Sequence, residues 1–174
     1  MSAILTLFRR YSRYNTLANQ RLYKACAALS DDQRKADRQA FFGSIHATLN
    51  HLLTGDRIWL PRLEGGEAPS TGLGNALFES FTALGEARRH EDQRLEAFVA
   101  ALTEADLSRL IDYSNNEGRM FSDPVSLALP HLFNHQTHHR GQVHDMLSQI
   151  GPNPLVLDMH RVLKPDPDSD IASV

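Results

Sequence analysis

Residues 123–151, DPVSLALPHLFNHQTHHRGQVHDMLSQIG, carry apolar side chains at the three- and four-residue intervals of an amphipathic helix. Asp123 is predicted to be the N-cap, with Pro124 at the first helical position. We expect the helix to end at Ile150, because Gly151 suits a C-terminal cap and prolines follow it. A long helix with one apolar face must pack against other elements, so this stretch favours a helical bundle.

Four of the nine histidines lie between residues 131 and 139 of this stretch. On a helix, His135 and His139 lie nearly one above the other, roughly 70° and 30° from the centre of the apolar stripe. His131, His138 and His144 lie about 110–130° from it. Two imidazoles facing a core are costly to charge, whereas neutral imidazole is a good ligand for zinc, nickel or iron. The spacing therefore predicts that His135 and His139 bind a metal, with a third ligand from another helix.

The rest of the chain predicts an all-α fold. Helical periodicity and capping signals predict helices over residues 4–29, 42–63, 76–102 and 123–150, with a short piece opened by the capping box Ser30–Gln33. Residues 65–75 are rich in Gly, Ser and Pro and predict a loop. Residues 107–121 predict either a small hairpin or an irregular crossover. We expect one domain, residues 1–174, folded as a four-helix bundle with long connections between helices two and three and between helices three and four.

Composition limits the classes of partner. The net charge is −3 and both signs are interspersed, which argues against nucleic acid and anionic membranes as partners. Cys26 lies among apolar residues and is expected to pack rather than react. The charged run Glu86–Glu96 is most simply a solvated helix face. The first ten residues lack a signal-peptide pattern, so a cytoplasmic location is expected.

The third metal ligand is left open by periodicity. His46 and His51 both belong to the second long helix. The apolar stripe of that helix centres roughly 100–120° from each of them. Either histidine therefore remains a candidate to face His135 and His139.

Several separated motifs resemble one known family. The first helix contains Tyr14-Asn15 and Ala18-Asn19, and the second contains Thr48-Leu-Asn-His51-Leu followed by Asp56 and Trp59. The strongest motif is Asn134-His-Gln-Thr-His-His-Arg-Gly-Gln142, and Gly151-Pro-Asn-Pro154 and Asp158 follow it. Over residues 4–160 the chain resembles the DinB family, the DinB/YfiT-like metalloenzyme superfamily.

The resemblance implies an up-down-down-up four-helix bundle, commonly dimeric, that holds a divalent metal through three histidines. Matched residue by residue, these ligands are His51, His135 and His139. His46 then becomes an ordinary polar or partly buried helix residue. His138 is an alternative to His139, because residues three apart on a helix can also chelate.

Three ligands leave a position for water or substrate, which is typical of a catalytic metal site. Gln136 stands where zinc proteases with His-x-x-x-His spacing carry a glutamate base, so that mechanism is disfavoured. Asp56 is predicted either to orient an imidazole or to form an exposed salt bridge. Gln142 and Arg140 either order this end of the site or contact another helix.

Branches of the superfamily are thiol transferases that use the metal to activate a low-molecular-weight thiol. The leading hypothesis is therefore a metal-dependent transferase or hydrolase acting on a small molecule, with Zn²⁺ as the default metal, Ni²⁺ or Fe²⁺ as alternatives, and a homodimeric assembly. A stress-linked metal-binding protein without turnover is the second hypothesis. A metal-free interaction bundle is the third.

Overall fold

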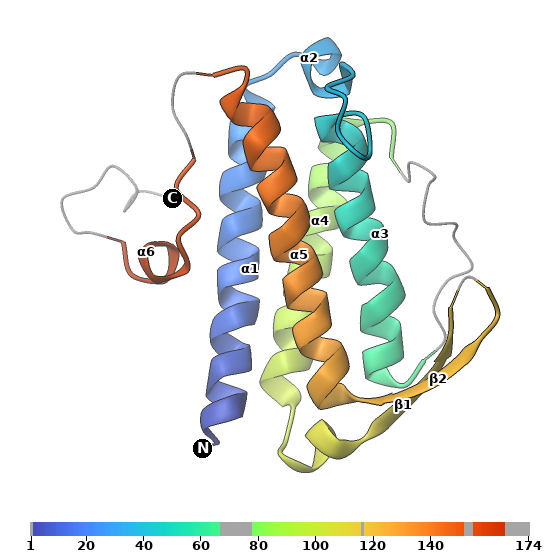
Figure 1. Cartoon of the computed structure of the whole chain (residues 1–174). Helices are drawn as coiled ribbons and strands as arrows, with labels where there is room; N and C mark the ends of the chain where they lie inside the picture. Colours follow the sequence, from blue (N-terminus) through green and yellow to red (C-terminus); the bar gives the residue numbers. More distant parts are fainter. Residues whose placement is uncertain (1, 67–77, 116, 152–154, 166–174) are drawn as a thin grey trace.

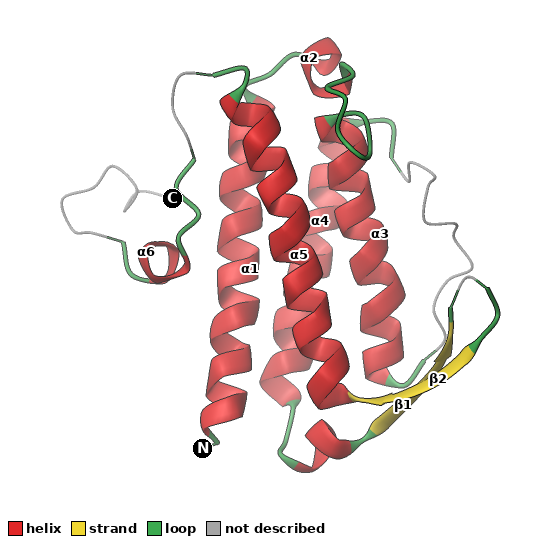
Figure 2. Cartoon of the chain, viewed as in Figure 1, coloured by secondary structure: helices red, strands yellow, loops and turns green. Residues whose placement is uncertain are grey.

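Four long helices form the body of the molecule (Figure 1). The computed structural model describes residues 2–66, 78–115, 117–151 and 155–165. The long helices are α1 (Ala3–Ala27), α3 (Ile45–Glu64), α4 (Phe81–Ala101) and α5 (Val125–Ser148). The short elements are α2 (Asp31–Lys35), a 3₁₀ helix η1 (Ala105–Ser108), strands β1 (Leu110–Ser114) and β2 (Met120–Pro124), and α6 (Met159–Leu163). The predicted all-α class is confirmed, with one small hairpin beside the helices (Figure 2).

The long helices run in two directions. α1 and α5 run from the bottom to the top of Figure 1, whereas α3 and α4 run from the top to the bottom. α3 packs against α5 and α4, and α1 packs against the same two helices. α3 and α5 are therefore antiparallel neighbours along their length. No helix within the described part of the chain is long and apolar enough to cross a membrane.

α3 begins later than predicted because a serine caps it. The Ser44 side chain accepts a hydrogen bond from the Ala47 amide at 3.2 Å, so Phe42 lies before the helix rather than within it. Gly65 ends α3 in the left-handed conformation, with φ of +87°. Pro61 lies inside the last turns and does not end the helix early.

Three other predicted helix boundaries also shift. α4 begins at Phe81 rather than at residue 76, because Ser80 caps it through the Ala83 amide. Asp123 is not the N-cap of α5. It belongs to β2, and its carboxylate accepts a 2.6 Å hydrogen bond from the Tyr113 hydroxyl. α5 also ends at Ser148, two residues before Ile150.

Of the two predictions for residues 107–121, the hairpin is correct. β1 and β2 pair antiparallel, from Leu110 opposite Pro124 to Ser114 opposite Met120. The capping box of α2, between Ser30 and Gln33, is also present. α6 was not predicted. The predicted loop of residues 65–75 lies outside the described residues from residue 67 onward.

The interior has an apolar cluster at each end and a polar level between them. One cluster contains Leu5, Phe8, Leu60, Leu63, Leu95, Val99, Leu102, Ile111, Val125, Ala128, Leu129, Leu132 and Phe133. The other contains Leu22, Cys26, Ile45, Leu49, Leu52, Leu53, Leu84, Val143 and Met146. Cys26 is fully buried, and burial raises the pKa of its thiol to about 12, so it packs as predicted. The polar residues between the two clusters include Asn15, Asn19, Asp56, Arg88, Asp92, Gln136 and Arg140, all of them buried.

Candidate metal centre

Three imidazoles converge between α3 and α5. Nε2 of His51 on α3 lies 3.1 Å from Nε2 of His135 and 3.1 Å from Nε2 of His139, both on α5. One ring nitrogen from each histidine falls within 4.8 Å of the others, a separation at which the three could hold one metal ion. The tertiary structure thus selects His51 over His46 as the residue that faces the pair.

The close approach of α3 and α5 depends on a glycine. Gly55 lies one turn after His51, on the side of α3 that faces α5. A Cβ atom at this position would lie 2.5 Å from Cε1 of His135 and 3.0 Å from its Nδ1. Even an alanine side chain would therefore displace the His135 ring. Gly55 leaves the space that the imidazole occupies.

Gln142 sets the tautomer of His139. Nδ1 of His139 lies 2.8 Å from Oε1 of Gln142, one turn further along α5. A carbonyl oxygen only accepts hydrogen bonds, so Nδ1 of the neutral ring donates its proton there. The lone pair of His139 is then on Nε2, which points toward His51. Of the two roles predicted for Gln142, it orders the site.

An aromatic ring and partial burial favour neutral imidazoles. The Phe42 ring stacks on His51 with centroids 3.9 Å apart, and meets the His139 ring edge-on at 5.5 Å. Burial, together with the neighbouring His139 and His51, lowers the pKa of His135 to about 3. Burial also lowers the pKa of His139, although the hydrogen bond that the ring donates to Gln142 raises it. The His135 and His139 imidazoles are therefore predominantly neutral at pH 7.

The donor set fits a divalent ion. Each neutral imidazole carries one N–H, and that of His139 is directed to Gln142 rather than into the cluster. Nε2 of His51 lies 3.1 Å from Nε2 of each of the other two rings, and one nitrogen of every ring lies within 4.8 Å of the others, close enough to share one ion. Imidazole nitrogen is a common ligand of zinc, nickel and iron.

The remaining histidines discussed above lie outside the cluster. His46 is buried, and its Nε2 lies 2.8 Å from the carbonyl oxygen of Phe78. His138 is exposed, and its ring packs edge-on against His139 at 4.8 Å. His131 packs on Trp59, and His144 contacts the carbonyl oxygen of Leu155.

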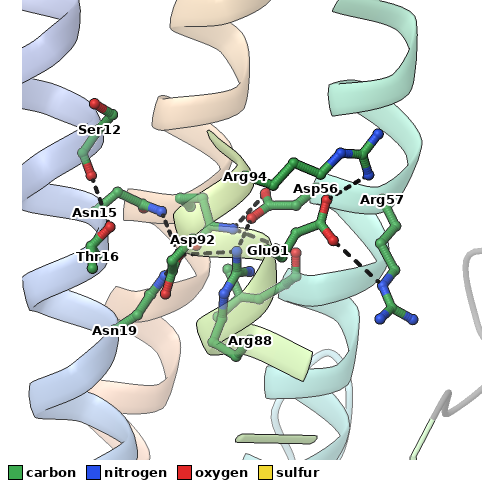
Figure 3. A network of polar contacts seen from close by, with 12 residues as sticks. Ser12, Asn15, Thr16, Asn19, Asp56, Arg57, Arg88, Glu91, Asp92 and Arg94 are labelled. Carbon is green, nitrogen blue, oxygen red and sulfur yellow. Dashed lines mark hydrogen bonds and ion pairs between the residues drawn. The ribbon is translucent and has the colours of Figure 1, made fainter. Parts of the chain in front are cut away.

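A buried network of charged and amide side chains joins α1, α3 and α4 (Figure 3). Nη2 of Arg88 on α4 lies 2.6 Å from Asp56 of α3 and 3.0 Å from Asp92 of α4. All three side chains are at most 2% exposed. Burial raises the pKa of Asp92 to about 7, although Arg88 and the Asn19 amide oppose this shift.

Amides and a second arginine complete this network. Asn15 and Asn19 of α1 both donate to the Asp92 carboxylate. Arg140 of α5 donates to the side-chain oxygens of both asparagines and to that of Gln136. Gln136 in turn donates to Asp56 at 2.5 Å. The network consequently joins all four long helices.

The network corrects two expectations and decides a third. The charged run of α4 is not simply solvated, because Arg88, Glu91 and Asp92 are 2–3% exposed. Asp56 is 1% exposed and pairs with Arg88, so it does not form an exposed salt bridge, and its partners are not imidazoles. Arg140 contacts another helix, which was one of its two predicted roles.

Gly55 and Phe42 were missed as site residues. A glycine inside a helix costs about 1 kcal/mol relative to alanine, so Gly55, four residues after a candidate ligand, was a usable signal of close packing. Phe42 carried no such signal. Its contact with His51 depends on the path of the chain before α3.

Comparisons with known proteins show which family and which fold the chain resembles. A sequence model described as the DinB family matches residues 1–169. The chain is 30% identical over 151 residues to Protein DinB of Bacillus subtilis (strain 168), covering 83% of this chain and 86% of that protein. A crystal structure of a DinB-like protein from Bacillus cereus ATCC 10987 has a similar fold, with a TM-score of 0.57 and 22% identity over 82% of this chain and 90% of that one.

Proposed function

The chain belongs to the DinB family, and from this membership and the convergence of three imidazoles we propose that it binds one divalent metal ion through His51, His135 and His139. The observation that carries the proposal is the pair of 3.1 Å separations between Nε2 of His51 and those of the other two rings. Zn²⁺ is the proposed metal, because three histidines and one open position are common in catalytic zinc sites. Ni²⁺ and Fe²⁺ are the alternatives.

We assign the four long helices to the up-down-down-up bundle class. The directions of α1, α3, α4 and α5 and the contacts between them support this assignment. In such a bundle, ligands on facing helices meet without any loop having to hold them. The homodimer stays a prediction, which light scattering coupled to gel filtration would check.

The proposed activity is a metal-dependent transfer reaction on a low-molecular-weight thiol. A divalent ion at this site would bind the thiol sulfur and favour its deprotonated, nucleophilic form. The thiol must come from outside, because the single cysteine of the chain, Cys26, is buried in an apolar cluster. His139 is oriented by Gln142, and Phe42 covers one side of His51, so the chain fixes two ligands and shields the site from part of the solvent.

A hydrolase of the zinc-protease type has less support. Such a mechanism uses a carboxylate next to the metal as the general base. Among the described residues, no carboxylate belongs to the group of potential ligands. Gln136 is fully buried and donates to Asp56, on the side of α5 that faces the network.

Elemental analysis of untagged protein, purified without a metal-affinity column, tests the metal site. We expect near-stoichiometric metal in the wild type and its loss in His51→Ala. The matched control is His138→Ala, which removes an exposed imidazole adjacent to the cluster and should retain the metal. Metal absent from the wild type, or retained by His51→Ala, contradicts the site. A metal-loaded protein without thiol-transfer activity would favour the non-catalytic alternative.

A further inference from the structure

Phe41, which precedes the ring that stacks on His51, is exposed to solvent. Phe41 is 86% exposed, more than any other large apolar residue in the described part of the chain. Its ring meets that of Phe42 edge-on, with centroids 4.8 Å apart. Phe42 itself stacks on His51 at 3.9 Å. One aromatic ring therefore separates an exposed phenylalanine from the proposed metal ligands.

The turn that presents Phe41 is fixed by hydrogen bonds. The Arg38 amide donates to the carbonyl oxygen of Gly43 at 2.7 Å, and the Gly43 amide donates to that of Ala40 at 2.8 Å. Gly43 adopts a φ of +76°, which only glycine reaches without strain. Ser44 then caps α3 directly after the turn. Phe41 is thus held at a defined position beside the cluster.

We propose that Phe41, with Phe42 behind it, is the specificity element of the site and receives an aromatic or extended apolar group of a thiol bound at the histidine cluster. This inference rests on the proposed metal-binding function. A substrate whose sulfur binds at the histidines would place its adjoining carbon skeleton next to the rings that border them. Burying an exposed ring against such a group is favourable, and aromatic pairs add to it.

Two thiols on cobalt-loaded protein test the assignment. Co²⁺ is bound in place of the native metal, and its visible absorption is followed during titration with phenylmethanethiol or with 2-mercaptoethanol. We expect wild type to prefer phenylmethanethiol. Phe41→Ala should lower that preference by about 2- to 10-fold, the effect of one aromatic contact, and should leave Co²⁺ affinity unchanged. Phe41→Leu should keep part of the preference.

The control is Met120→Ala, which truncates another exposed apolar residue, 66% exposed on the hairpin. It should leave the preference as in wild type. Equal preference in wild type and Phe41→Ala overturns the role of Phe41 while the metal site stands. Wild type that takes up no Co²⁺, or whose Co²⁺ spectrum neither thiol changes, overturns this inference together with the function on which it rests. A change of oligomeric mass in Phe41→Ala would instead assign the ring to a contact between copies of the chain and overturn the proposal.

Discussion

The histidine cluster and the buried network are built from adjacent residues of the same helices, but the side chains that they bring together differ in chemistry. Gly55 and His135 belong to the cluster, whereas their immediate neighbours Asp56 and Gln136 belong to the network. In the network, Arg88 pairs with two aspartates, and Arg140 donates to the side-chain oxygens of Asn15 and Asn19. In the cluster, Nε2 of His51 lies close to Nε2 of both His135 and His139, so chemically identical atoms face each other. Opposite charges that pair with one another stabilise the fold, whereas three imidazole nitrogens brought close together are placed to hold a metal ion.

The largest effect is expected in the network. Arg88→Met removes the cation between Asp56 and Asp92 and leaves two buried carboxylates without it. Breaking a buried ion pair from one side typically costs about 3–5 kcal/mol. Urea unfolding should show a loss of this size in the free energy of unfolding. Arg89→Met, at an exposed neighbouring position, should stay within about 0.5 kcal/mol of wild type. A loss below about 1 kcal/mol in Arg88→Met would mean that the network contributes little to the fold.

The second prediction concerns the glycine that admits His135. Gly55→Ala places a methyl group 2.5 Å from the His135 ring, which must move away from the cluster. We expect Zn²⁺ affinity to fall by about 10- to 100-fold, as it does when the support of a ligand is lost. Competition with a chromophoric chelator measures this change.

The matched control is Gly141→Ala on α5, where an added Cβ meets nothing within 4 Å. This variant should bind metal normally and gain up to about 1 kcal/mol of stability from helix propensity. If both variants bound Zn²⁺ as the wild type does, the position of His135 would not depend on the space at Gly55.

A smaller effect is expected from the residue that orients His139. Gln142→Ala removes the acceptor of the Nδ1 proton, so the ring can rotate and change tautomer. Zn²⁺ affinity should fall by about 10-fold, measured by the same competition. Gln149→Ala, which removes a surface contact with Asp145, is the control and should have no effect. An unchanged affinity in Gln142→Ala would show that His139 is held by its packing alone.

The smallest expected effect is the pH dependence of the free energy of unfolding of the metal-free protein. Because the pKa of His135 is lowered to about 3, the unfolded chain binds a proton below about pH 6.5 that the folded chain does not. Stability should therefore fall as the pH falls, by less than about 1 kcal/mol between pH 7 and pH 6. His135→Ala should make the free energy of unfolding less dependent on pH over this range. Urea unfolding at both pH values checks the sign, and an equal slope in the variant would contradict it.

Much of the helical scaffold could be predicted from periodicity and caps, because both depend on residues near one another in the chain. The capping box at Ser30 and the long helices near residues 3–27 and 125–148 were predicted to within a few residues. The starts of α3 and α4 were placed too early, since Phe42 and Phe78 extend the apolar pattern beyond the serines that cap the helices.

The sequence by itself determined the helical class and the orientation of His135 and His139 toward the core side of their helix, and its family motifs predicted His51 as the third ligand. The first two follow from local spacing, which helix geometry converts directly into direction, whereas the preference for His51 rests on the family resemblance. Only the tertiary structure decided that Arg88 pairs with Asp56, that Gly55 makes room for His135, and that Phe42 covers His51. Each of these contacts joins residues from different elements, or from a helix and the turn before it. Their meeting depends on how the elements pack, which no local pattern records.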